Sequence, residues 1–348
     1  MQQQDKPFLA GLTRRELNTW MESVHAAKFR ATQVAEWICR HLTVDPAAMK
    51  NLPLPLRSEL SAQFHAPGCR VADTAASADG TEKLLLELYD GETVEMVVIP
   101  GREERITFCL STQVGCPVRC RFCASGRDGL IRNLHAGEII EEFLLGCARI
   151  GRKPDGLVFM GIGEGLLNFK ELVRTLELLT SPEHFGMSPR RITVSTSGYV
   201  PGMLKFAELQ KEFTLAISLH AVDDATRARL IPDPLRYPIS EIMAAADRYL
   251  EQAGRIVTLE YTLLAGINDA TAAAEALGRL ARRHHAKVNL IPYNSTGTEF
   301  RRPDPATIAN FERTVAGTGA HVTLRTERGG ESAAACGQLR RLAAGRGK

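Results

Sequence analysis

Residues 115–123 read Gly-Cys-Pro-Val-Arg-Cys-Arg-Phe-Cys and hold the cysteines Cys116, Cys120 and Cys123. The spacing is C-x3-C-x2-C, and no fourth cysteine follows closely. Thiolates hold iron–sulfur clusters, and a 4Fe–4S cluster has one ligand position on each iron. Three close ligands would leave one iron open to a substrate or cofactor. An open metal position is typical of catalysis rather than of structure.

A zinc site is the main alternative for this run. Structural zinc needs four ligands, often as two C-x2-C pairs, and the nearest downstream histidine, His135, has no standard spacing. Disulfides are a weaker alternative, because eight cysteines in 348 residues is ordinary usage. The first residues, Met-Gln-Gln-Gln-Asp, do not read as a signal peptide, and no apolar run approaches the roughly 18 residues of a membrane span. We expect a cytoplasmic protein with reduced thiols and no membrane contact.

The composition is that of an ordinary globular protein. Hydrophobic residues make up 44% of the chain and charged residues 24%, which is compatible with a large core and excludes a disordered chain. The length of 348 residues suits a large domain with a smaller one. The net charge of +3 permits a nucleic-acid partner without requiring one.

The first part of the chain, residues 1–75, is predicted to be a small helical domain. Thr13 and Glu16 form a capping-box pattern, and Leu12 can pack on Leu17 at the same helix start. Further helices are expected at 29–39 and from the Pro-rich break at 51–55 to residue 60. Residues 76–104 are then predicted to form a β-hairpin extension, with Asp90-Gly91 as a type I′ turn.

From residue 105 to 330 strands and helices alternate. The predicted strands are 105–112, 157–161, 191–196, 214–220, 256–264 and 287–294, with a further strand at 322–326. The predicted helices are 137–150, 170–179, 201–209, 240–252, 270–284 and 306–317. Repeated βα units imply a parallel sheet with right-handed crossovers. The fold class is therefore α/β, a partial TIM-like barrel of six β/α units, with chemistry expected at the carboxyl ends of its strands. Residues 331–348 would be a C-terminal loop and tail.

Several stretches together resemble the RlmN/Cfr family of radical SAM RNA methyltransferases. The cysteine run, with Phe122 before its last cysteine, resembles the radical SAM superfamily in general. The narrower family is indicated by residues 29–38, 109–116, 132–134, 163–168, 328–329 and 334–339, so the resemblance covers almost the whole chain. One departure stands out: the family's Gly-Glu-Pro-Leu-Leu-Asn is here Gly-Glu-Gly-Leu-Leu-Asn, with Gly165 in place of proline.

The resemblance implies a cofactor set and a reaction. One 4Fe–4S cluster would be held by Cys116, Cys120 and Cys123, with S-adenosyl-L-methionine (SAM) on the open iron. The reduced cluster would split SAM into methionine and a 5′-deoxyadenosyl radical, and two SAM would be used per turnover. The product would be an adenine methylated at carbon 2 or carbon 8 in RNA, with 23S rRNA or tRNA as the substrate. An electron donor such as flavodoxin or ferredoxin is implied.

Two further cysteines and a glutamate match catalytic residues of that family. Cys336 would receive a methyl group from one SAM, and the methylene radical formed from it would attack adenine. Cys109 would then attack the Cys336 sulfur and release methylated RNA, leaving a transient Cys109–Cys336 disulfide. Glu95 would accept the proton of the adenine carbon. Without the resemblance, Cys109 would be a strand cysteine facing the core, Cys336 a small buried side chain, and Glu95 a solvated strand residue.

The SAM contacts implied by the resemblance lie at or beyond the carboxyl ends of predicted strands. They are Gly163, Glu164, Ser195, Ser218, Leu219, His220 and Asn294. The glycine-rich run 161–165 could also pass for a dinucleotide loop, but that fingerprint needs glycine where Leu166 stands.

Two other functions stay open at the sequence level. The same radical mechanism could act on a different RNA site or another substrate, and a zinc-stabilised nucleic-acid-binding protein would have no catalysis at all. A monomer is expected, because a large substrate needs an open rim.

Overall fold

The computed structural model describes residues 6–232, 236–325, 329, 334–335 and 337–339. Within these residues one ten-stranded sheet runs in the order β1-β2-β3-β4-β7-β8-β9-β10-β11-β12. The strands are β1 (Cys69–Ala76), β2 (Glu82–Leu88), β3 (Thr93–Pro100), β4 (Ile106–Cys109), β7 (Gly156–Phe159), β8 (Ile192–Thr196), β9 (Thr214–Ser218), β10 (Thr258–Leu263), β11 (Lys287–Pro292) and β12 (Val322–Leu324).

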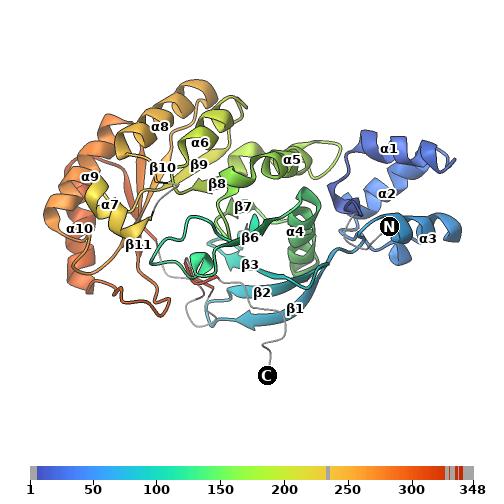
Figure 1. The fold of residues 1–348 in the computed structure, drawn as a ribbon, viewed down its shortest axis with the longest axis horizontal. Helices are drawn as coiled ribbons and strands as arrows, with labels where there is room; N and C mark the ends of the chain where they lie inside the picture. The colour runs from blue at the N-terminus through green and yellow to red at the C-terminus, as the bar shows by residue number, and fades with distance from the viewer. Residues whose placement is uncertain (1–5, 233–235, 326–328, 330–333, 336, 340–348) are drawn as a thin grey trace.

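The strands from β4 onward are parallel, and they follow one another in chain order. Helices stand between them and cover the outside of the curved sheet (Figure 1). These helices are α4 (Ala136–Ile150), α5 (Phe169–Thr180), α6 (Val200–Ala207), α7 (Asp224–Leu230), α8 (Ile239–Ala253), α9 (Thr271–Arg283) and α10 (Pro305–Gly317). The strand order of the described chain ends at β1 and β12, so the predicted partial α/β barrel is confirmed.

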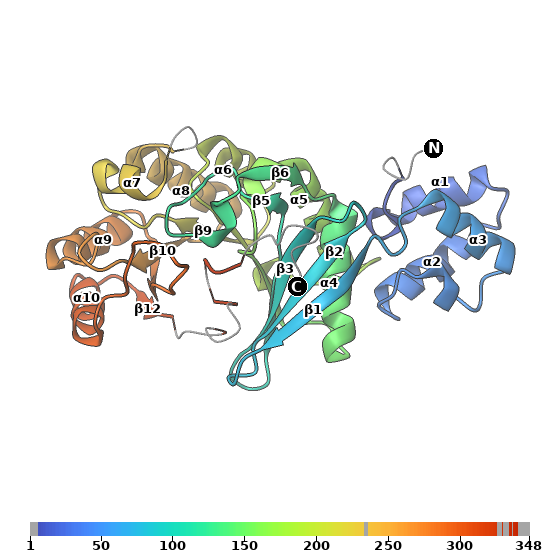
Figure 2. The same cartoon turned by 60° about the horizontal axis from the view of Figure 1, so that its bottom comes forward.

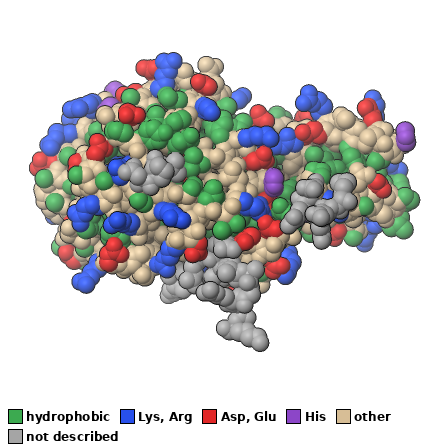
Figure 3. Space-filling model, in the orientation of Figure 1, with side chains coloured by type: hydrophobic (Ala, Val, Ile, Leu, Met, Phe, Trp, Pro, Cys, Tyr) green, Lys and Arg blue, Asp and Glu red, His purple; other side chains and the backbone are tan. Residues whose placement is uncertain are grey.

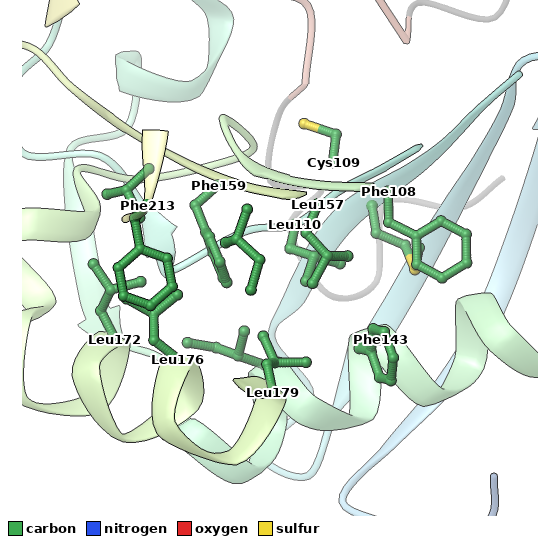
Figure 4. Close-up of a cluster of buried hydrophobic side chains, with 14 of the residues drawn as sticks. Phe108, Cys109, Leu110, Phe143, Leu157, Phe159, Leu172, Leu176, Leu179 and Phe213 are labelled. Carbon is green, nitrogen blue, oxygen red and sulfur yellow. The ribbon is translucent and has the colours of Figure 1, made fainter. Parts of the chain in front are cut away.

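The hydrophobic core lies between this sheet and its helices. Figure 4 shows side chains of β4 and β7, among them Phe159, packed over α4 and α5 together with Leu110, which directly follows β4. The rings of Phe108 and Phe143 meet edge to face at 6.2 Å. Gly146 lets α4 approach the sheet, because a Cβ there would lie 2.7 Å from the Phe108 ring. Each large apolar side chain buried in this way contributes roughly 1.5–3 kcal/mol.

Three antiparallel strands, β1 to β3, extend the sheet beyond β4 (Figure 2). The predicted hairpin is confirmed, but the predicted turn type, type I′, is wrong. Gly91 has φ +82° whereas Asp90 does not have a positive φ, and the Gly91 N–H donates to the Leu88 carbonyl at 2.9 Å. This is a type I turn followed by a glycine bulge rather than a type I′ turn. The expectation that residues up to 75 are helical is also wrong, because 69–76 form β1.

The helical part is smaller and ends earlier than expected. It contains α1 (Arg14–Ser23), α2 (Phe29–Cys39) and α3 (Leu54–Gln63), which stand together at one end of the molecule (Figure 1). The capping box of Thr13 and Glu16 is confirmed. Arg174 of α5 donates to the Gly11 carbonyl at 2.7 Å, which fastens this part to the barrel. No helix in the described ranges is long and apolar enough to cross a membrane.

Two small elements frame the cysteine run and were not predicted. Strands β5 (Gln113–Gly115) and β6 (Leu130–Asn133) pair antiparallel, so the run and its continuation form the loop between them. We call residues 116–129 the cysteine loop. It follows β4 on the carboxyl side of the parallel strands, as the barrel expectation requires.

Candidate functional site

The three cysteines of the cysteine loop line one cavity. Its wall also contains Gly163, Glu164, Ser195, Ser218, His220 and Asn294, together with Glu260, Thr262 and Arg325. These residues come from β7 to β12 and the segments that follow these strands. The structure therefore brings together the expected cluster ligands and the expected SAM contacts, with one exception. Leu219 is fully buried outside the cavity wall and contributes only backbone, its N–H donating to the Glu260 carbonyl at 3.0 Å.

Backbone contacts hold the cysteine loop in a compact conformation. The Cys116 N–H donates to the Gly129 carbonyl at 3.0 Å, and the Cys123 N–H donates to the Cys120 carbonyl at 3.1 Å. Arg119 has φ +56°, and a Cβ at Gly126 would lie 2.7 Å from the Arg119 Cα. The loop is thus folded tightly enough that the glycine at 126 has no room for a side chain.

The environment of the three thiols fits an iron–sulfur cluster. Burial, and next the neighbouring Cys123 thiol, raise the pKa of Cys116 to about 12, and the pKa of Cys120 is raised well above its ordinary value by burial and the other two thiols. These thiols lose their protons only where a cation compensates, which cluster irons do. In the described residues no three His, Cys, Asp or Glu side chains converge on a single ion. Cluster ligands each bind a separate iron, and three thiols from one loop can serve as such ligands.

Glu164 is held by backbone donors beside the cysteines. Its carboxylate accepts from the Ser197 N–H at 2.6 Å and from the Leu166 N–H at 3.3 Å. Burial raises the pKa of Glu164, and the Ser197 hydrogen bond opposes that rise. Gly163 makes this placement possible, since its φ is +112° and a Cβ would lie 2.7 Å from the Gln113 side chain. The carboxylate can accept from a cationic amine in the cavity.

His220 is a neutral donor in the same wall. Its Nδ1 accepts from the Thr262 N–H at 3.0 Å, which leaves the proton on Nε2. Burial, and next the positive charge of Arg227, lower the pKa of His220 to about 3. The ring meets Phe122 edge to face at 4.8 Å, and the backbone of His220 has φ +59°. Phe122 of the cysteine loop therefore packs on a residue of the cofactor wall.

A second cavity adjoins the first and contains Cys109. The two cavities share Cys123, Ser125, Met160, Gly161, Ile291, Asn294, Arg325 and Gly337. Cys109 lies at the end of β4, and its side chain points away from the core side chains of Figure 4. Cys109 is buried at the edge of the core cluster and also lines this cavity.

The chain on both sides of residue 336 lies at this second cavity. Ala335 and Gly337 line it, and the Gly337 carbonyl accepts from the Ala124 N–H at 2.8 Å. The Leu339 carbonyl accepts from Ser125 Oγ at 2.6 Å. Cys336 itself lies outside the described residues. Its described neighbours are thus hydrogen-bonded to the cysteine loop directly after Cys123.

Glu95 is buried rather than solvated. Its carboxylate forms an ion pair with Lys83 at 2.8 Å. Val97 pairs with Cys109 across β3 and β4, and residues two apart in a strand share a face, so Glu95 and Cys109 lie on the same face of the sheet. Glu95 is not part of the wall of either cavity.

Three charged residues at or beside the first cavity were not identified from the sequence: Arg227, Glu260 and Arg325. Arg227 of α7 is fully buried, and its charge acts on Cys120, while burial lowers the pKa of Arg227 to about 10. Glu260 of β10 accepts from Asn289 at 2.7 Å, and burial raises its pKa against the positive charge of Arg325. A single charged residue inside an otherwise uncharged strand was the available signal for Glu260. For Arg227 the available signal was Asp223, which could have been recognised as the N-cap of the short helix that contains Arg227. In the structure the Asp223 side chain accepts from the Thr226 N–H at 2.7 Å.

Comparisons with known proteins agree with this geometry. Residues 110–276 match the model of the radical SAM superfamily, and residues 8–65 match that of the ribosomal RNA large subunit methyltransferase N-terminal domain. A probable dual-specificity RNA methyltransferase RlmN from Akkermansia muciniphila is 39% identical, over 96% of this chain and 95% of its own length. The protein of the same description from Gloeobacter violaceus is 42% identical, over 96% and 95%. A crystal structure of a radical SAM methyltransferase from Sphaerobacter thermophilus has a TM-score of 0.92 and 40% identity, over 96% of this chain and 99% of that one.

Proposed function

The chain belongs to the RlmN family of radical SAM RNA methyltransferases, and we propose that it methylates carbon 2 or carbon 8 of an adenine in 23S rRNA and in tRNA. The observation that carries this proposal is the pair of adjoining cavities. One cavity contains the three cysteines and Glu164, the other contains Cys109, and both contain Gly337, the residue after Cys336. Such a layout suits a reaction that uses a cluster, SAM and two further thiols.

The first cavity would hold the cofactors. When bound, the cluster on Cys116, Cys120 and Cys123 would supply the electron that splits SAM into methionine and a 5′-deoxyadenosyl radical. Glu164 would accept from the SAM amino group, because its carboxylate lines the cavity beside the cysteines. The other contacts would come from Ser195, Ser218, His220 and Asn294 along the rim, with the Gly163 backbone close to SAM.

The second cavity would hold the two carbon-handling cysteines. Cys336 would carry a methyl group from one SAM, lose one hydrogen to the radical and join adenine through the methylene carbon. The radical adduct so formed would lose the adenine-carbon proton and one electron, and the electron would return to the oxidised cluster. The Cys109 thiolate would then attack the Cys336 sulfur, so that an S–S bond forms, the C–S bond breaks and its electron pair takes up a proton as the new methyl group. Glu95 would accept the adenine-carbon proton, which requires Glu95 to reach the second cavity from its ion pair with Lys83. A reductant would restore both thiols.

Nucleoside mass spectrometry of rRNA and tRNA tests this proposal. Cells that contain the protein should have a ring-carbon methyladenosine that cells without it lack. Restoring the wild-type gene should restore that nucleoside, whereas a Cys336→Ala gene should not. Unchanged adenosines in both RNA pools would refute the RNA substrate, and methylation at another RNA position would favour the alternative substrate.

A further inference from the structure

A basic pocket lies on the outer side of the cysteine loop. It is lined by Arg121, Arg229 and Arg301, with Leu230, Ala265, Ile267, Glu299 and Phe300 between them. We call these residues the arginine pocket. All three arginines are exposed, and within the described ranges none forms an ion pair with a carboxylate. Figure 3 shows Lys and Arg side chains gathered on this face, over α7 and the loop beside it.

The floor of the arginine pocket is shared with the cluster ligands. Leu230 belongs to a small apolar cluster with Val118, Phe122, Ile231, Leu264 and Tyr293. Cys116, Cys120 and Cys123 pack against this cluster, and so do Ile267 and Phe300 of the pocket. The Arg121 N–H also donates to the Leu230 carbonyl at 3.0 Å, one residue from Cys120. One apolar layer therefore separates the exposed arginines from the cysteine sulfurs.

The arginine pocket is separate from the cavities proposed for SAM and adenine. None of its eight lining residues lines either of those two cavities. A partner in the arginine pocket would leave the Cys109 cavity accessible. Three arginines against the single carboxylate of Glu299 attract an anionic surface, and such charge speeds association with a protein of opposite charge.

We propose that the arginine pocket docks an acidic one-electron carrier protein that reduces the cluster. The proposal rests on the proposed function, because a radical SAM cluster must be reduced by an outside donor before it can split SAM. The carrier is oxidised by one electron and the cluster is reduced by one, with no atom transferred. Electron transfer slows steeply with distance, so a carrier docked behind one apolar layer is well placed.

Binding of a flavodoxin, used as the acidic probe, tests the docking directly. The variant Arg229→Glu/Arg301→Glu reverses two charges without touching the cysteine loop. Its dissociation constant for oxidised flavodoxin, measured by anaerobic calorimetry on cluster-loaded protein at low salt, should rise at least about tenfold. The single variant Arg313→Glu, an exposed position of α10 outside the pocket, is the control and should change it less than about twofold.

Turnover provides the second readout. With reduced flavodoxin, the double variant should form 5′-deoxyadenosine more slowly than the Arg313→Glu control, and with dithionite the two should be equal. Equal losses with both reductants, or unchanged flavodoxin binding, would overturn the docking site. Weaker binding of a fluorescent RNA hairpin with unchanged flavodoxin binding would overturn it as well and assign the pocket to RNA. Wild-type protein that forms no 5′-deoxyadenosine with dithionite would instead refute the proposed function, and the calorimetry would still decide the docking.

Discussion

The Glu164 carboxylate provides a sharp test of how the first cavity binds SAM. Glu164→Gln keeps the shape of the side chain and removes its charge. Its amide oxygen can still accept from the Ser197 N–H, which lies 2.6 Å from the carboxylate in the native protein. Its amide nitrogen would then face the Leu166 N–H and the SAM ammonium. Both of these groups are donors, and an amide nitrogen cannot accept a hydrogen bond from them.

The expected loss follows from the energy of a charge-assisted hydrogen bond. Such a bond contributes about 1.5–3 kcal/mol, which corresponds to about 10- to 150-fold in the dissociation constant of SAM. The pH dependence should change too. Burial raises the pKa of Glu164, so its ionised fraction, and with it the affinity of wild-type protein for SAM, increases as pH rises through that pKa. The glutamine variant should lack this increase.

Equilibrium dialysis of radiolabelled SAM against the anaerobic, cluster-loaded protein measures this loss. Glu142→Gln is the matched control, because Glu142 is equally buried, accepts from the Ser111 N–H at 2.9 Å and lies outside both cavities. The control should bind SAM like wild type. A Glu164→Gln protein that also binds SAM within about twofold of wild type would refute the assigned contact.

Three further outcomes are expected. Cys109→Ala should accumulate a covalent protein–RNA adduct through Cys336, seen as a slow band on denaturing gels; normal turnover without an adduct would contradict the two-cysteine mechanism. Burial raises the pKa of Glu141 from an ordinary 4.5 to about 7, so the folded state holds an extra proton and loses stability as pH rises between those values. Glu141→Gln should remove up to about 1.4 kcal/mol of that loss per pH unit in denaturant titrations, and an unchanged slope would refute the raised pKa. Gly165→Pro should be neutral or stabilise the protein by about 0.4–1 kcal/mol in the same titrations, because Gly165 begins a short 3-10 helix, where proline fits; a clear loss of stability would contradict this geometry.

Elements with a strong local pattern could be predicted from the sequence. The parallel strands and most of their helices were located within a few residues, because most of these strands are rich in apolar or β-branched residues and the helices have a periodic apolar face. β1 could not be found in this way. Its residues are almost all exposed at the end of the sheet, so no apolar alternation marks it. α7 has seven residues, which is too short for a periodic signal.

The residues of the site also fall into those that the sequence could identify and those that it could not. The cysteine spacing and the family resemblance located the cavity walls, since those residues belong to contiguous motifs. Arg227 and Glu260 depend instead on contacts with other elements of the chain, with the Ser197 carbonyl and with Asn289, which periodicity does not show. The burial of Glu95 arises within the hairpin, where the pairing of β2 with β3 brings Lys83 to its carboxylate, a side-chain contact that the strand pattern does not show.

The most direct test of the radical mechanism uses SAM with a trideuterated methyl group. The purified, cluster-loaded protein would be incubated with this SAM, a reductant and RNA, and the methylated nucleoside would be analysed by mass spectrometry. If Cys336 carries the methyl group and loses one hydrogen from it, the product methyl group contains two deuterium atoms and one hydrogen. A product that retains all three deuterium atoms would show direct methyl transfer and would contradict the proposed roles of Cys109 and Cys336.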